Sequence, residues 1–128
     1  MKMLRKIFLS LAIASSMSAV STSVYAEVDP GRITYSPSQA IDLTIEKIHA
    51  AIAVIDSGAE GEAVATAVKD ALDMSKEINA NDKVDVARSR ANGHLKKARS
   101  AAKKGDLQPA EEHLRMGLKA FQSLKSLL

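Results

Sequence analysis

The chain has 128 residues, no cysteine, aromatic residues at only 3% of positions and a formal net charge of +3. This length allows one domain of ordinary size, and an apolar fraction of 46% is typical of a folded chain rather than a disordered one. The absence of cysteine excludes disulfides, cysteine-based metal sites, thiol catalysis and lipidation of an N-terminal cysteine. The core must therefore be built from Ala, Leu, Ile, Val and Met.

Residues 1–26 predict a secretory signal peptide. Basic residues precede an apolar stretch, and Val24-Tyr25-Ala26 has the small–spacer–small pattern of a cleavage site. An uncleaved membrane anchor is the alternative, but the uninterrupted apolar run is shorter than the ~20 residues that span a bilayer. We therefore expect a periplasmic or secreted protein that consists of residues 27–128 and has no stable membrane insertion after cleavage.

The charge is divided unevenly along the chain. The predicted signal peptide contains three basic residues and no acid, so the remaining chain is neutral. Residues 27–79 contain ten acids and four bases, whereas residues 80–128 contain eleven bases and five acids. The positive net charge is therefore no indication of an anionic partner, and we expect the opposite signs to favour docking of the second half on the first.

Residues 27–36 are predicted to form an irregular leader, and the first helix is predicted to start at Ser36-Pro37. Serine is a preferred N-cap, and proline is preferred at the first helical position. Isoleucines then recur every four or three residues, as on one face of an amphipathic helix, at Ile41, Ile45, Ile48, Ile52 and Ile55. Gly58 is expected to end this helix.

A second helix is predicted from Glu60 or Gly61 to Ile78. Its apolar stripe comprises Val64, Val68, Ala71, Met74 and Ile78. A turn then precedes a third helix, which has an N-cap at or near Asp82 and ends at Lys103-Lys104-Gly105. The stripe of the third helix comprises Val84, Ala87, Ala91, Leu95, Ala98 and Ala102.

Asp106 is expected to cap a fourth helix, with Pro109 tolerated in its first turn. The apolar stripe of this helix comprises Ala110, Leu114, Leu118, Phe121, Leu124 and Leu128. Four amphipathic helices with short connections predict an all-α fold, an antiparallel up-down-up-down four-helix bundle over residues 37–128 made of two helical hairpins. A solenoid fragment is the alternative, but two hairpins are fewer than such folds usually need.

A shift of 47 residues aligns the two hairpins. It pairs Ile48 with Leu95, Ala51 with Ala98, Gly58 with Gly105, Ala63 with Ala110 and Ala71 with Leu118. Chance agreement between helices of the same periodicity is the alternative. The coincident turn glycines favour an internal helix–turn–helix repeat.

Two histidines, His94 and His113, flank the apolar stripes of the third and fourth helices at similar distances from Gly105. Antiparallel packing would leave them within about one helical turn in height, where imidazoles can ligate Cu, Ni or Zn. Glu112 is the nearest carboxylate that could supplement them. The alternative is a pair of ordinary boundary histidines, because basic residues crowd the third helix and would repel a cation.

The segment 94–118, HLKKARSAAKKGDLQPAEEHLRMGL, resembles the hairpin repeat of the small metal-binding protein family. The matching positions are His94, Leu95, Ala98, Gly105, Ala110 and His113. The resemblance implies a periplasmic four-helix bundle that binds copper, nickel or zinc through histidines. In the first hairpin Lys47 and Thr66 stand at the two histidine positions, so only the second hairpin carries the metal-bearing residues.

The third helix has a basic face that could contact phosphate or anionic lipid. Its members are Lys83, Arg88, Arg90, Lys96, Lys97, Arg99, Lys103 and Lys104. That helix has no aromatic residue for base stacking, and we expect no nucleic-acid partner. Pairing with the acidic first hairpin, or simple solvation, is the favoured interpretation.

No catalytic set is recognisable, because the chain has no cysteine, no Gly-rich phosphate loop and no nucleophile motif. The Met and His that ligate haem in periplasmic four-helix cytochromes are also missing at the corresponding ends of the first and last helices. We therefore expect a non-enzymatic protein without a certain cofactor. It either binds a divalent transition metal ion or acts as a helical interaction protein that binds another envelope protein.

Overall fold

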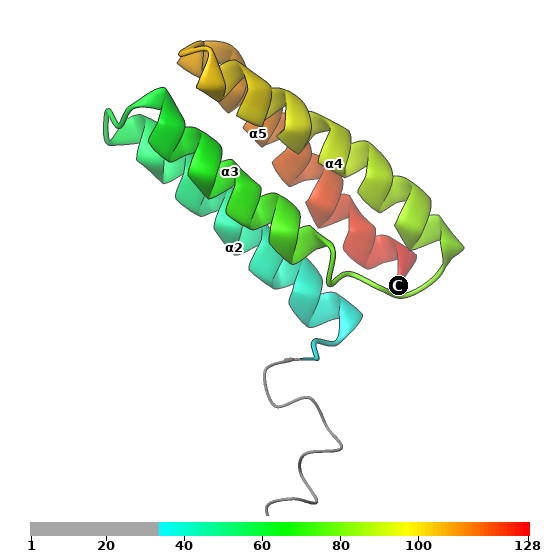
Figure 1. Cartoon of the computed structure of the whole chain (residues 1–128). Helices are drawn as coiled ribbons and strands as arrows, with labels where there is room; N and C mark the ends of the chain where they lie inside the picture. Colours follow the sequence, from blue (N-terminus) through cyan, green and yellow to red (C-terminus); the bar gives the residue numbers. More distant parts are fainter. Residues whose placement is uncertain (1–33) are drawn as a thin grey trace, which may run out of the picture. The chain divides into compact units, whose positions relative to one another are not determined.

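The computed structural model describes residues 34–128, so the predicted signal peptide and leader residues 27–33 lie outside the described range. Four α-helices follow in order: α2 (Pro37–Asp56), α3 (Gly61–Ser75), α4 (Asp82–Lys103) and α5 (Leu107–Leu124). A short 3-10 helix, η2 (Lys125–Leu127), ends the chain, and residues 34–128 contain no strand. The predicted all-α four-helix bundle is confirmed (Figure 1).

Consecutive helices are antiparallel and pack in a ring, α2 on α3, α3 on α4, α4 on α5 and α5 back on α2. The α2–α3 and α4–α5 turns lie at one end of the bundle (Figure 1). The start of α2, the α3–α4 connection and the C terminus lie at the other end. At that end the Asn81 side chain accepts a hydrogen bond from the Val84 amide and donates one to the Leu127 carbonyl.

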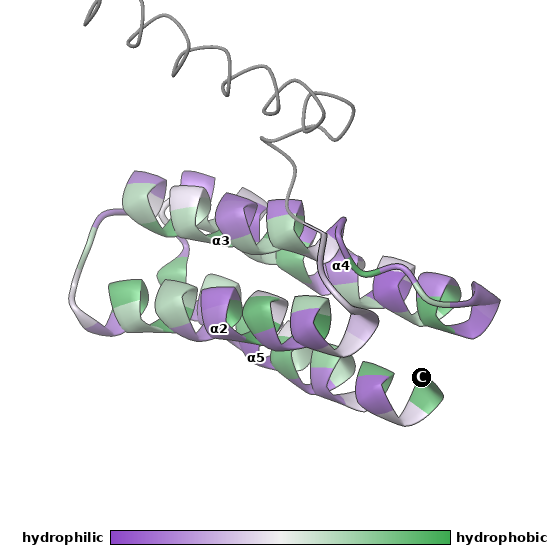
Figure 2. Ribbon diagram, turned by 90° about the horizontal axis from the view of Figure 1, so that it is seen from below, coloured by the Kyte–Doolittle hydropathy of each residue, from purple (hydrophilic) through white to green (hydrophobic). Residues whose placement is uncertain are grey.

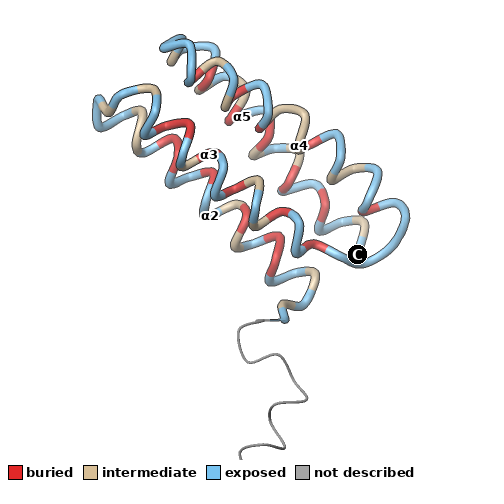
Figure 3. Tube along the Cα trace, viewed as in Figure 1, coloured by how far each residue is buried: buried red, intermediate tan, exposed pale blue. Residues whose placement is uncertain are grey.

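The core is aliphatic apart from one ring. Hydrophobic and hydrophilic residues alternate around each helix (Figure 2), and the buried positions recur along the sides that face the other helices (Figure 3). The largest fully buried apolar side chains are Phe121, Ile41, Ile48, Ile78, Leu95, Leu114 and Leu124. Buried alanines on all four helices let the backbones approach closely, which suits a core with few large side chains.

The buried face of α2 is rotated from the predicted isoleucine stripe. Ile45 and Ile55 are only half-buried, whereas Ala40, Thr44 and Ala51 are buried. Thr44 tolerates this position because its hydroxyl donates to the Ala40 carbonyl over 2.8 Å. Similar shifts leave Met74, Ala87 and Leu118 only half-buried. Leu128 is exposed for another reason, because α5 ends at Leu124 and Leu128 follows η2.

One predicted helix end is wrong, and another is confirmed in position but lacks the expected capping hydrogen bond. The second helix ends at Ser75 rather than Ile78, because the amides of Lys76, Glu77 and Ile78 donate to carbonyls three residues earlier, in the tighter 3-10 pattern, rather than four residues earlier. Ile78 is nevertheless fully buried. Asp106 occupies the N-cap position of α5, but within the described residues its side chain makes no capping hydrogen bond.

Both hairpin turns have the same geometry. Gly58 and Gly105 adopt φ of 80° and 82°, the left-handed region in which glycine is favoured. The amide of each glycine donates to the carbonyl three residues earlier, and the next amide donates to the carbonyl five residues earlier. This is the Schellman arrangement, and a 47-residue shift superimposes one set of bonds on the other.

After the turns, the alignment between the two hairpins changes from a shift of 47 residues to a shift of 46. Two residues separate Gly58 from the start of α3, but only one separates Gly105 from the start of α5. Buried positions in α3 and α5 therefore pair at a shift of 46: Val64 with Ala110, Val68 with Leu114 and Ala71 with Gly117. The predicted partners Ala63 and Leu118 are wrong because Ala63 is exposed and Leu118 half-buried.

Candidate functional site

The predicted metal residues lie on α4 and α5, two helices that pack directly on each other. His94 of α4 and His113 of α5 are both half-buried, and Glu112 is exposed. The remaining histidine, His49, is exposed on α2. Helix packing therefore brings His94 and His113 to one interface and leaves His49 outside it.

Gly117 sets the closeness of α4 and α5 beside these histidines. A Cβ atom on Gly117 would lie 2.9 Å from Leu95 Cδ2 and 3.6 Å from His94 Cβ, so the α5 backbone rests against the base of the His94 side chain. His113 lies four residues before Gly117, which puts it about one helical turn from His94 along the bundle axis. The height predicted from the antiparallel register agrees with this placement.

The Nδ1 atoms of His94 and His113 are both buried, and neither has a hydrogen-bond partner within residues 34–128. Buried polar atoms normally have a partner, so this pair is unusual. In the tautomer that carries its proton on Nε2, such an Nδ1 atom keeps its lone pair for a metal ion. In the described part of the chain, no group of three or more His, Asp or Glu side chains converges as metal ligands, and Glu112 does not complete such a group.

A second site lies in a groove between α3 and α4, which we call the α3–α4 groove. Its volume is about 560 Å³, and it is lined by Lys69, Leu72, Asp73, Lys76, Asn92, Lys96, Arg99, Ser100 and Lys103. The basic side of α4 was predicted from the sequence, but the cationic wall that α3 contributes was not. The available signal was the pair Lys69 and Lys76, which lie seven residues apart and hence on one helical face.

The charges of the two hairpins do not pair as expected. Across residues 34–128, one ion pair joins the hairpins, between Asp42 and Lys125. The other ion pairs connect residues three or four apart in sequence: Lys69–Asp73, Lys76–Asp73, Arg88–Asp85 and Arg115–Glu111. Of the first-hairpin acids that were expected to meet the basic face of α4, Asp73 is held by local neighbours, and the ion pairs within residues 34–128 join none of them to α4.

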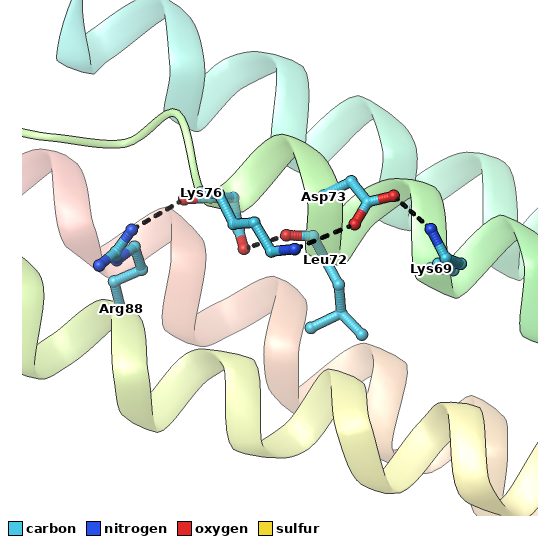
Figure 4. A network of polar contacts seen from close by, with 6 residues as sticks. Lys69, Leu72, Asp73, Lys76 and Arg88 are labelled. Atoms are coloured by element: carbon cyan, nitrogen blue, oxygen red, sulfur yellow. Dashed lines mark hydrogen bonds and ion pairs between the residues drawn. The ribbon is translucent and has the colours of Figure 1, made fainter.

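Asp73 shows this local pairing most clearly. Lys69 donates to one carboxylate oxygen of Asp73 over 2.7 Å, and the Nζ atom of Lys76 lies 3.4 Å from the other oxygen (Figure 4). Lys69 and Lys76 therefore share one acid. The hydrogen bond from Lys69, supported by Lys76, holds the pKa of Asp73 below its ordinary value of 3.8. Arg88 approaches the end of α3 from α4, where it donates to the Ser75 carbonyl over 3.4 Å.

Comparison of the chain with protein-family models, with curated proteins and with solved structures finds no match. Among the described residues, no helix combines the length and apolar character needed to cross a membrane. A four-helix bundle hosts many unrelated activities. Function therefore follows from the residues of the two sites alone.

Proposed function

We propose that this chain is an exported, non-enzymatic helical bundle that binds a divalent transition metal ion through His94 and His113. The observation that carries the proposal is the pair of buried Nδ1 atoms without hydrogen-bond partners among residues 34–128. They lie on two helices that Gly117 allows into close contact. Imidazole pairs suit Cu, Ni and Zn, and solvent or the exposed Glu112 carboxylate would supply the remaining ligands.

The mechanism is sequestration by neutral imidazoles. The two histidines are about one helical turn apart in height, and because both Nδ1 atoms are buried, the side chains must turn to present ring nitrogens to a shared ion. Because only the deprotonated nitrogen is a ligand, binding weakens as the pH falls and protons compete with the metal. The cationic side chains of α4 oppose binding, so we expect a moderate affinity that improves as salt screens them.

Titration of the purified, untagged protein with Cu(II) or Ni(II), followed by calorimetry and absorption spectroscopy, tests the proposal. We expect saturable binding that the His94→Ala, His113→Ala double variant loses. His49→Ala is the matched control, because it removes an exposed imidazole from another helix and should leave binding unchanged. Glu112→Gln should weaken binding only if that carboxylate supplements the histidines. Absence of saturable heat, or equal binding by the double variant, would refute metal binding.

The second candidate function is a helical interaction protein of the cell envelope. It is favoured by a shallow apolar depression of about 400 Å³ lined in part by Val86, Ala87 and Leu127, in which Val86 is 54% exposed. Contiguous exposed apolar residues mark interaction surfaces more often than isolated ones do. Full biological activity of the double histidine variant, combined with its loss in Val86→Asp, would select this function over metal binding.

A further inference from the structure

The α3–α4 groove has a charge that the proposed metal function does not use. Five of its lining side chains are cationic, and one is a carboxylate. The cations come from both walls, with Lys69 on α3 and Lys76 directly after it, and the other three on α4. A potential of one sign concentrated in a hollow attracts anions more strongly than the same charges spread over a convex surface.

The one carboxylate of the groove is already shared by two lysines. Asp73 contacts both Lys69 and Lys76 along α3 (Figure 4). On the opposite wall Lys96, Arg99 and Lys103 form no ion pair with any residue in the range 34–128. The positive excess of the groove is therefore concentrated on the α4 wall.

Arg99 is the least exposed cation of this groove, since the four lysines that line it are exposed. Its side chain is half-buried, and its Nε atom is buried with no hydrogen-bond partner in the described chain. A buried donor without an acceptor costs free energy, and Nε of Arg88, outside the groove, is in the same state. Asn92 Oδ1 in the same groove is also buried and unpaired within residues 34–128. The terminal amide of Asn92 can turn to present its NH₂ group instead.

The dimensions of the groove suit a small molecule. Its volume of about 560 Å³ lies within the ordinary range for ligand pockets. Lys69 and Lys76 on one wall, and Lys96 and Lys103 on the other, each span two helical turns, or ~10 Å. None of the lining residues is aromatic, and Leu72 is the one large apolar side chain among them. The groove is therefore built to hold charge and has no platform for stacking a base.

We propose that the α3–α4 groove binds an anion that carries two or more phosphate groups, with the guanidinium group of Arg99 donating to a phosphate oxygen and the lysines of both walls neutralising the rest. Phosphate suits this donor set because a guanidinium binds it through parallel hydrogen bonds, while lysines bind it as point charges. Ser100 adds a hydroxyl donor on the α4 wall. This site is separate from the histidines and does not depend on metal binding.

Calorimetric titration of the purified protein with sodium tripolyphosphate in EDTA-containing buffer tests the proposal. We expect saturable binding at low salt, and we expect Arg99→Gln to lower the affinity by about 10-fold or more. Lys97→Gln is the matched control, because it removes one charge from the exposed side of the same helix outside the groove. The double histidine variant should bind tripolyphosphate as well as the wild type does, which separates this site from the metal site.

A gain of affinity provides a result that misfolding cannot imitate. Asp73→Asn removes the carboxylate that occupies Lys69 and Lys76, so it should raise the affinity for tripolyphosphate about 2–5-fold. Equal losses in Lys97→Gln and Arg99→Gln would overturn the proposal, since they would show a response to net charge alone. Unchanged affinity in Asp73→Asn would overturn it as well.

Vesicles distinguish the two sources of the phosphate. Phosphatidylcholine vesicles that contain phosphatidic acid present several phosphate groups side by side on a lipid surface, and vesicles of phosphatidylcholine alone are their control. Binding of tripolyphosphate that requires Arg99 assigns a soluble ligand, whereas Arg99-dependent binding to the phosphatidic acid vesicles alone assigns a lipid headgroup. Absence of binding to both probes, or binding to oligothymidylate that is indifferent to Arg99→Gln, would refute the site.

Discussion

A Cβ atom on Gly61 would lie 2.1 Å from the carbonyl oxygen of Ala102, so the first residue of α3 packs directly on the backbone at the end of α4. Gly105, in the α4–α5 turn, lies beside the same position, since its Cα would be 3.5 Å from that Cβ. Both hairpin turns therefore meet at this end of the bundle. The contact joins the two hairpins through backbone atoms, which cannot move aside as a flexible side chain can.

Gly61→Ala is expected to lower the free energy of unfolding by about 1–3 kcal/mol, the usual cost of overpacking. In a position without steric conflict this substitution would stabilise the protein, because alanine restricts the unfolded chain. The sign of the change, measured by urea denaturation, therefore reports the Gly61–Ala102 contact. An increase in stability would contradict the close approach of α3 to α4.

Gly93→Ala is the matched control. Gly93 lies inside α4, and a Cβ there would have no heavy atom within 4 Å other than those of its chain neighbours and of the local α4 backbone. The substitution should raise the free energy of unfolding by about 0.5–1 kcal/mol, because glycine is a poor residue for a helix interior. Opposite signs at Gly61 and Gly93 would separate the steric effect from helix propensity.

At the other end of the bundle, Asn81 links the α3–α4 connection, in which it lies, to α4 and to η2. It accepts from the Val84 amide over 3.0 Å as the N-cap of α4 and donates to the Leu127 carbonyl over 3.1 Å. Asn81→Ala removes both bonds and should cost about 1 kcal/mol, mostly from the lost cap. Asn81→Asp keeps the capping oxygen but loses the donor. It should therefore retain most of the stability while the amide protons of η2 exchange faster, as measured by NMR.

The helices themselves could be predicted from the sequence because their signals are local. Apolar spacing, Ser36-Pro37 at the start of α2 and the glycines after α2 and α4 act within a few residues, and the structure agrees with them. The exact buried face was harder to predict. Ile45 and Ile55 have the right spacing, but each helix contacts two neighbours, so alanines beside the stripe become the most buried positions.

The α3–α4 groove could not be predicted because it depends on which charges find local partners. The net charges of the hairpins favoured pairing between them, yet Asp73 is bound by Lys69 and Lys76 from its own segment. Residues three or four apart on a helix are neighbours without any loss of chain entropy. An acid with such neighbours is therefore occupied before the hairpins dock, and the cations of α4 stay available.

Phe121 is the one aromatic side chain among the buried residues of the described chain, and it is fully buried. Phe121→Ala should lower the free energy of unfolding by about 3–5 kcal/mol, because it removes apolar surface and leaves a cavity among small aliphatic neighbours. Phe121→Leu should cost much less. Calorimetry of both variants would check the ranking, and equal losses would indicate that the ring packs loosely.

The ion pairs of Asp73 predict a specific dependence of stability on pH. The pKa of Asp73 is lowered by the Lys69 hydrogen bond, so the stabilisation is complete above the ordinary value of 3.8 and is lost as the pH falls through the lower pKa of the folded state. Near neutral pH, Asp73→Asn should cost about 0.3–0.5 kcal/mol, as for exposed helical pairs.

This cost should disappear in acid, where the carboxyl is protonated in both states, and it should shrink as salt screens the pairs. The control is Asp70→Asn, since Asp70 is exposed on the same helix and forms no ion pair within residues 34–128. Urea denaturation of both variants across this pH range measures the difference. If the deficit of Asp73→Asn persisted unchanged in strong acid, the lysines would not be its cause, and they would not be held by this carboxylate in the α3–α4 groove.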